Sequence, residues 1–236
     1  MKTDKINIDT FETPLGVIRL DISSTVSLNT ITISQTNSMK LVDTPNYHIE
    51  VIPFSNIKGW MRNTEFPVDD SKGWIFRITK KNSNVEQLKI NCELVSTDSG
   101  ITSTPDSGED LDAIWIENKT HVLSIGTEDG ERLKCRASHD DLMPKRLEKE
   151  LGYQPKSSSF TNSSFTNYLE REFEISVPEL KTDERIYFHY LVATKSKEYS
   201  MEGDISTNLA VDFAKWTLLE TLGLNEWANK ASLGDS

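Results

Sequence analysis

The side chains best suited to chemistry cluster near the middle of this 236-residue chain. Cys135 is followed by His139, Asp140 and Asp141, and a thiolate becomes nucleophilic when a nearby base or cation lowers its pKa. His139 would supply that base if the chain turned back at this point. The competing interpretation is structural, because Cys135 alternates with Leu133 as a buried strand residue would, and either aspartate fits as a helix cap. The pattern favours the structural interpretation.

A second candidate is His189, which lies between Phe188 and Tyr190 on a predicted strand. An imidazole flanked by aromatic side chains on a sheet face is suited to lining a ligand pocket, and a hydrogen-bonded structural histidine fits the same pattern. Cys92 is simpler: it shares a strand face with apolar residues and is predicted to be a core thiol.

The signatures of the most easily recognised enzyme classes are absent from the sequence. It contains no GxxxxGK[ST], GxGxxG, HExxH or GxSxG motif, and its two cysteines, 43 positions apart, form no CxxC pair. His48 and His121 stand on predicted strands without a third ligand, so we predict no metal and no cofactor.

The chain is acidic, with 37 Asp plus Glu against 26 Lys plus Arg. Residues 1–97 are neutral, residues 98–112 carry five acids and no base, and residues 113–236 hold the remaining excess of acid. This distribution argues against binding along nucleic-acid backbones, which requires clustered bases. The one basic doublet, Lys80-Lys81, is predicted to be a solvated hairpin tip.

Alternating apolar residues predict strands throughout residues 1–97. The clearest runs are 18–22, 47–51, 74–78 and 88–94. No window there has a helical period, so we expect an all-β domain, an antiparallel sandwich or barrel. Residues 98–112 combine Ser, Thr, Gly, Pro and acid, which predicts a linker or long loop between two domains, although a single composite domain remains possible.

Residues 113–236 are predicted to form an α+β domain, an antiparallel sheet with two helices. Three strands are expected between Ile114 and Arg136, with Asp129-Gly130 as a hairpin turn. Further strands are expected at 173–177, 186–192 and 209–213, the second of them central because it is apolar on both faces. One helix is predicted from Asp140 or Asp141 to Gly152, and another from about residue 214. The whole chain is therefore expected to be α+β and mainly β.

Two function hypotheses follow. The first is a non-catalytic binding or adaptor protein, such as an inhibitor or immunity-type protein, that presents an acidic surface to a basic protein partner and contacts neither nucleic acid nor membrane. Its predicted contact residues lie in two polar loops and are Asp106, Glu109, Asp110, Asp112, Phe160 and Phe165. The second is an enzyme or small-ligand binder with a site near His189. No apolar run is long enough to span a bilayer and no secretory leader is evident, so we expect a cytosolic protein.

Overall fold

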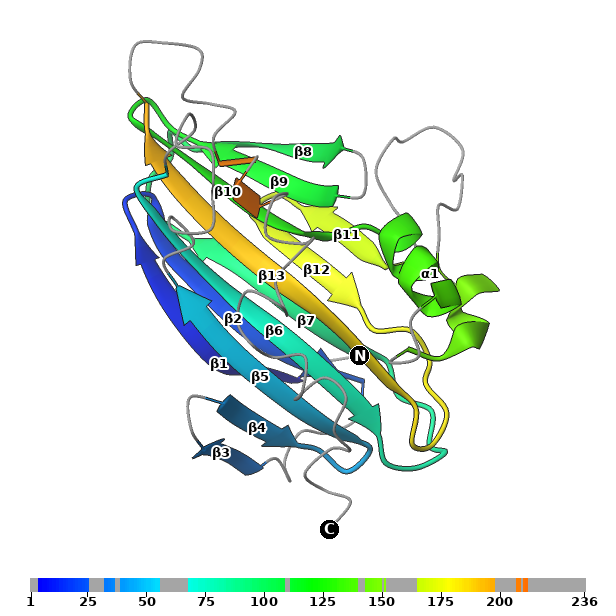
Figure 1. Cartoon of the computed structure of the whole chain (residues 1–236). Helices are drawn as coiled ribbons and strands as arrows, with labels where there is room; N and C mark the ends of the chain where they lie inside the picture. Colours follow the sequence, from blue (N-terminus) through cyan, green and yellow to red (C-terminus); the bar gives the residue numbers. More distant parts are fainter. Residues whose placement is uncertain are drawn as a thin grey trace.

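Two antiparallel β-sheets make up most of the molecule (Figure 1). The computed structural model describes residues 4–25, 32–36, 39–55, 68–108, 111–139, 143–149, 151, 165–197, 207–208 and 210–211. The prediction of a mainly β protein is confirmed.

The first sheet has five strands in the order β1, β2, β7, β12 and β11. Their bounds are β1 Asp4–Thr13, β2 Gly16–Ser24, β7 Leu88–Val95, β12 Glu172–Ser176 and β11 Thr166–Leu169. Alternation of residue type sets the two faces of this sheet. Leu20 is paired with Cys92 on the buried face, while the neighbouring pair of Arg19 and Glu93 lies on the opposite face.

The second sheet has eight strands in the order β3, β4, β5, β6, β13, β10, β9 and β8. Their bounds are β3 Thr32–Thr36, β4 Met39–Asp43, β5 Tyr47–Ser55, β6 Asp70–Lys80, β13 Arg185–Ser196, β10 His121–Glu128, β9 Leu111–Glu117 and β8 Thr102–Gly108. Strand β13 is buried on both faces along most of its length and lies between β6 and β10, so its predicted central position is confirmed.

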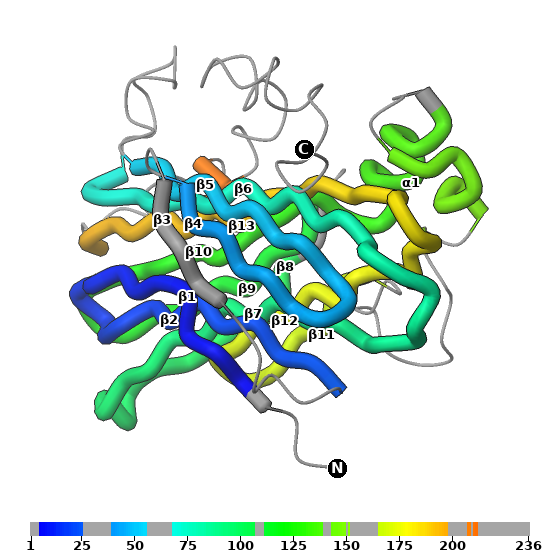
Figure 2. Tube along the Cα trace, turned by 90° about the horizontal axis from the view of Figure 1, so that it is seen from below, coloured from blue at the N-terminus to red at the C-terminus, as the bar shows by residue number. Residues whose placement is uncertain are grey.

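The two sheets pack against each other across one shared core, and Figure 2 shows β1, β2, β7 and β12 in one layer with β5, β6 and β13 in another. Trp74, Phe76 and Tyr190 from the second sheet belong to the same apolar cluster as the inward residues of the first. The Tyr190 hydroxyl lies 2.8 Å from the carbonyl oxygen of Ile90 and 2.9 Å from that of Phe173. This buried phenol therefore joins the two sheets.

Strands from both ends of the chain are mixed within each sheet. In the first sheet β7 pairs with β12, and in the second β6 pairs with β13. An all-β sandwich or barrel confined to residues 1–97 is therefore not confirmed, because these residues divide their strands between two sheets that the later residues complete.

The sequence predicts a linker or long loop at residues 98–112, but part of this segment is a strand. Thr102–Gly108 forms β8, which pairs with β9 in register from Thr102 opposite Glu117 to Gly108 opposite Leu111. The prediction failed because an edge strand needs backbone pairing on one side only and little apolar surface of its own.

The helical predictions for residues 129–152 require correction. Strand pairing ends at Glu128, and helix α1 (Gly130–His139) replaces the strand expected at 133–136. The Asp129 side chain caps this helix, since its Oδ1 accepts the Arg132 amide at 2.7 Å. The helix expected up to Gly152 is only a short 3-10 turn, η2 (Lys145–Lys149), within the described residues.

The C-terminal predictions are only partly covered by the structure. Residues 207–208 and 210–211 are helical, whereas a strand was expected at 209–213, and the helix predicted from about residue 214 lies outside the described residues. None of the helices in the described ranges has the length and apolarity needed to cross a membrane.

A bulge in β1 ties this edge strand to the second sheet. The register shifts between Asn7 and Asp9, which turns Asp9 towards the facing sheet. Its Oδ2 accepts the Trp74 indole N–H at 2.7 Å, and its carboxylate lies 3.0 Å from Lys40 Nζ and 2.9 Å from Lys72 Nζ. Burial raises the pKa of Asp9, but the hydrogen bonds from Lys72, Trp74 and Lys40 outweigh it and lower the pKa to about 2.

Candidate functional site

The structure describes only part of the cysteine and histidine candidate set. Cys135 lies on α1 and is exposed, so the prediction that it is a buried strand residue is wrong. His139 is the last residue of α1, one helical turn from Cys135, while Asp140 and Asp141 lie outside the described residues. Cys92 is a fully buried core thiol, as predicted, and burial raises the pKa of its thiol. A buried thiol of this kind is inert.

His189 is buried on the face of the second sheet that points away from the shared core. It pairs with Ile75 of β6, and its carbonyl oxygen accepts the Thr127 hydroxyl. On the same face Arg77 forms a buried ion pair with Glu50, with 2.7 Å between Nη2 and Oε1. The sheet thus carries charged and titratable side chains where a strand face would ordinarily be apolar or solvated.

The predicted contact residues that the structure describes have internal partners. Asp112 is buried and accepts hydrogen bonds from Thr166 and, at 2.8 Å, from the Tyr168 hydroxyl. Phe165 is buried with its ring edge-to-face against Phe188, 5.5 Å between centroids. Asp106 accepts a hydrogen bond from the Asn208 amide.

Neither Asp112 nor Phe165 therefore lies on the surface. The other predicted contact residues, Glu109, Asp110 and Phe160, lie outside the described residues.

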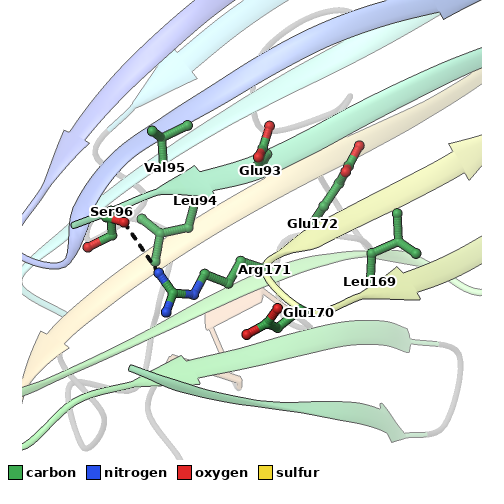
Figure 3. Close-up of a pocket in the computed structure, with 8 residues that line it drawn as sticks. All are labelled: Glu93, Leu94, Val95, Ser96, Leu169, Glu170, Arg171 and Glu172. Atoms are coloured by element: carbon green, nitrogen blue, oxygen red, sulfur yellow. Dashed lines mark hydrogen bonds between the residues drawn. The ribbon is translucent and has the colours of Figure 1, made fainter. Parts of the chain in front are cut away.

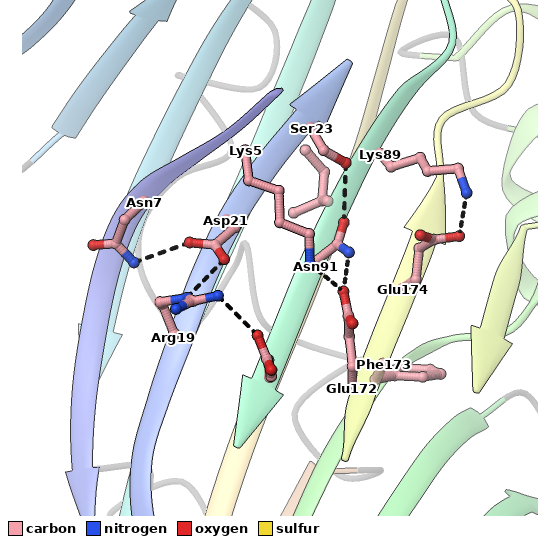
Figure 4. A network of polar contacts seen from close by, with 12 residues as sticks. Lys5, Asn7, Arg19, Asp21, Ser23, Lys89, Asn91, Glu172, Phe173 and Glu174 are labelled. Carbon is pink, nitrogen blue, oxygen red and sulfur yellow. Dashed lines mark hydrogen bonds and ion pairs between the residues drawn. The ribbon is translucent and has the colours of Figure 1, made fainter. Parts of the chain in front are cut away.

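An ordered polar face covers the side of the first sheet that points away from the core (Figure 4). The side chains of this polar face are Lys5, Asn7, Arg19, Asp21, Ser23, Lys89, Asn91, Glu93, Glu172 and Glu174. They come from four neighbouring strands and alternate with the core-facing residues, which is why opposite charges meet across strands.

Ion pairs hold the carboxylates of the polar face in place. Arg19 Nε donates to Asp21 Oδ2 at 2.8 Å and its Nη2 donates to Glu93 Oε2 at 2.9 Å. Lys5 Nζ lies 3.0 Å from Glu172 Oε1 and Lys89 Nζ lies 2.7 Å from Glu174 Oε1. The hydrogen bond to Asp21 raises the pKa of Arg19 above its usual value. Because these carboxylates already accept charged donors, the polar face is suited to presenting fixed charges and not to proton transfer.

An open depression lies at the end of this face, where β7 ends and β11 turns into β12 (Figure 3). Its volume is about 510 Å³. The residues that line this sheet-end depression are Glu93, Leu94, Val95, Ser96, Leu169, Glu170, Arg171 and Glu172. Arg171 reaches across it from the β11–β12 turn, with Nη1 3.4 Å from the carbonyl oxygen of Ser96.

The sheet-end depression combines carboxylates with exposed apolar side chains. Among the described residues the exposed large apolar side chains are Val85, Val95 and Leu169, and the last two, 44% and 45% exposed, belong to the depression. Glu170 is exposed and forms no ion pair with any described residue. The depression therefore offers an apolar patch beside an accessible negative charge.

Sequence reasoning missed this site. The alternation of Glu172 and Glu174 with Phe173 shows one polar strand face, but their partners Lys5, Lys89 and Asn91 come from strands 81 to 167 residues away. Only the strand order brings them together.

The described residues carry a nearly balanced charge. They contain 24 Asp plus Glu against 20 Lys plus Arg, so most of the excess acid of the chain lies elsewhere. Within these ranges no three His, Cys, Asp or Glu side chains are placed to hold a metal ion together.

Comparison with known proteins identifies no relative of this chain in sequence. No family model and no curated protein matches it. A solved structure titled "Putative kojibiose phosphorylase from human microbiome" aligns with 90% of this chain at 10% identity and a TM-score of 0.45. The alignment spans 27% of that protein's length. A likeness at this level carries no argument about the present chain.

Proposed function

We propose that this protein is a non-catalytic binding protein, an adaptor or inhibitor of the cytosol, that contacts a basic protein partner through the sheet-end depression. The observation that carries the proposal is the position of Val95 and Leu169, exposed apolar side chains that lie in the same depression as three glutamates. Exposed apolar groups beside charged residues are typical of protein contact surfaces.

The charges of the depression favour a basic partner. Three carboxylates, from Glu93, Glu170 and Glu172, line it against the single guanidinium of Arg171. Glu93 forms an ion pair with Arg19, and Glu172 forms one with Lys5. This leaves Glu170 as the most available acceptor for a basic partner. A carboxylate of this kind steers a basic partner and sets its orientation more than it adds affinity.

Partner capture from the native cell tests this proposal. The tagged full chain is purified at low salt, and the retained proteins are compared for the wild type, Leu169→Asp and Glu170→Lys. Val85→Asp is the matched control, because Val85 is 80% exposed and lies before β7, whereas the depression lies at the other end of that strand.

We expect a basic protein to be retained by the wild type and by Val85→Asp and to be lost by both depression variants. A wild-type chain that retains no protein, or a partner that all four chains retain equally, would contradict the proposal.

The alternative is a small-ligand site near His189. It is favoured by the burial of Glu50, Arg77 and His189 on one sheet face, since ligand pockets place a few convergent polar groups among apolar ones. If this alternative is correct, His189→Ala retains the wild-type circular dichroism spectrum and unfolding midpoint but loses a metabolite that co-purifies with the wild type. A variant that unfolds would show that His189 is structural.

A further inference from the structure

Four strands form the edges of the two sheets, and β1 is the longest of them. The others are β11 in the first sheet and β3 and β8 in the second. β11 and β3 have four and five residues, and β8 contains Pro105, which has no amide hydrogen to offer a neighbouring strand. β1 has ten residues and, in the part of the chain that the structure describes, pairs with β2 alone (Figure 1). A long edge strand is a template for pairing with another chain.

The backbone groups at the open edge of β1 follow from the hairpin that joins it to β2. Thr13 and Gly16 face each other across a two-residue loop, so the backbone groups of Thr13 point towards β2. This direction alternates along a strand, and the carbonyl of Thr10 therefore points to the open edge. Ile8 has no partner in β2, because the register shifts around it. The carbonyl oxygens of Ile8 and Thr10 are thus among the acceptors that a further strand would use.

Two lysines of the second sheet already occupy these carbonyl oxygens. Lys40 Nζ, from β4, donates to the Ile8 oxygen at 2.8 Å, and Lys72 Nζ, from β6, donates to the Thr10 oxygen at 2.8 Å. Both ammonium groups also contact the Asp9 carboxylate, which the bulge turns towards the second sheet. The two lysine side chains are only 20% and 19% exposed, so these contacts are largely shielded from water.

We propose that Lys40 and Lys72 block the open edge of β1 and so keep the chain from pairing there with a second copy of itself. A strand that added to this edge would have to displace both ammonium groups and leave the largely buried Asp9 carboxylate without its partners, which is costly. A bulge and inward-pointing charged side chains are two devices by which edge strands avoid association.

A second copy is the partner that fits this edge once it is uncovered. The same strand is present in each copy, and two antiparallel β1 strands can pair about a twofold axis. Such a pair would join two five-stranded sheets into one continuous sheet. The lysines therefore separate a monomer from a defined dimer that the fold would otherwise permit.

Sedimentation velocity and hydrogen exchange on the full chain test the inference. Lys40→Met/Lys72→Met removes both donors and keeps apolar side chains in their place. Lys5→Met/Lys89→Met is the matched control, because it removes the same charge from ion pairs on the polar face of the first sheet, which contact no carbonyl of β1.

We expect Lys40→Met/Lys72→Met to associate at concentrations at which the wild type and the control sediment as monomers. In the associated form the backbone amides of Thr10 and Glu12 should exchange at least tenfold more slowly than in the wild type, because they point to the same open edge. A double variant that stays monomeric, or one that associates without slower exchange at these amides, would overturn the proposal.

Two further variants separate an open edge from lost stability. Asp9→Asn removes the carboxylate that both lysines contact and keeps the lysines beside the β1 carbonyls, while Lys72→Arg keeps a donor for Thr10. We expect both to sediment as the wild type does. Should the double variant not fold, Lys72→Met, which retains the pair of Lys40 with Asp9, takes its place with the same expectation. Association of Asp9→Asn equal to that of the methionine variant would overturn the proposal, because lost stability would then explain both.

Discussion

Replacing Asp9 with asparagine should destabilise the protein by an amount that depends on pH. The hydrogen bonds that Asp9 accepts from Lys72, Trp74 and Lys40 lower its pKa from the usual 3.8 to about 2 in spite of burial. Each pKa unit corresponds to about 1.4 kcal/mol, so the folded state gains about 2 kcal/mol from the ionised carboxylate. We expect Asp9→Asn to lose about that amount of unfolding free energy at pH 7.

The sign of the pH dependence follows from the lowered pKa. A carboxyl group whose folded pKa lies below its unfolded value contributes its full stability above the unfolded pKa and loses it as the pH falls towards the folded pKa. The difference between the wild type and Asp9→Asn should therefore be constant from pH 7 to about pH 5, fall to about half near pH 3, and disappear only below about pH 2.

Urea unfolding followed by tryptophan fluorescence at pH 7, 5, 4 and 3 measures this difference. Glu12→Gln is the matched control, because Glu12 is an exposed carboxylate on the same strand without an ion pair to any described residue. It should change the unfolding free energy by less than about 0.5 kcal/mol at each pH. The reasoning is refuted if Asp9→Asn costs no more than this control, or if its cost is the same at pH 3 as at pH 7.

Three further outcomes are expected. Limited proteolysis should leave Thr102–Gly108 uncut in the first fragments identified by mass spectrometry, because these residues pair with β9; early cleavage there would restore the linker interpretation. Tyr190→Phe should lower the unfolding free energy in urea by about 1 to 2 kcal/mol, since it keeps the ring and removes the hydroxyl that joins the sheets; an unchanged midpoint would contradict this. Gly126→Ala should speed hydrogen exchange at residues 210–211, because a Cβ there would lie 2.8 Å from Val211 Cγ2, and Val211→Ala should reduce the effect; unaltered exchange would show that the segment does not pack there.

The strands that alternate cleanly were predictable from the sequence. The runs around Leu20, Ile49, Phe76 and Ile90 each place one set of alternating apolar residues in the shared core, and the two-sided apolar run of β13 lies at the centre of its sheet. In these segments the alternation of residue types along the sequence matches the burial in the fold. Alternation alone is therefore enough to assign each strand.

The elements that were predicted wrongly have sequence patterns that are compatible with two different structures. Asp129-Gly130 resembles a hairpin turn, yet the aspartate caps α1 and the glycine begins it. β8 has too few apolar residues to show a period, because its pairing with β9 supplies its stability. Lys80 looked solvated because lysine usually is, whereas strand alternation turned it inward onto Tyr47.

The candidate site could not have been predicted at all from local pattern. Arg19 meets Glu93 and Lys5 meets Glu172 only because β2 pairs with β7 and β7 with β12. Register over such separations is a property of the whole fold, and a single sequence contains no local signal for it.

The central place of β13 has a consequence for synthesis on the ribosome. Residues 185–196 emerge late, yet they fill the gap between β6 and β10, so both of these strands present open edges until β13 has been synthesised. Contacts between residues more than a hundred positions apart form slowly, and unpaired edges are templates for intermolecular pairing. Chains truncated before residue 185 should therefore aggregate, and a chaperone that shields strand edges should raise the yield of the native protein.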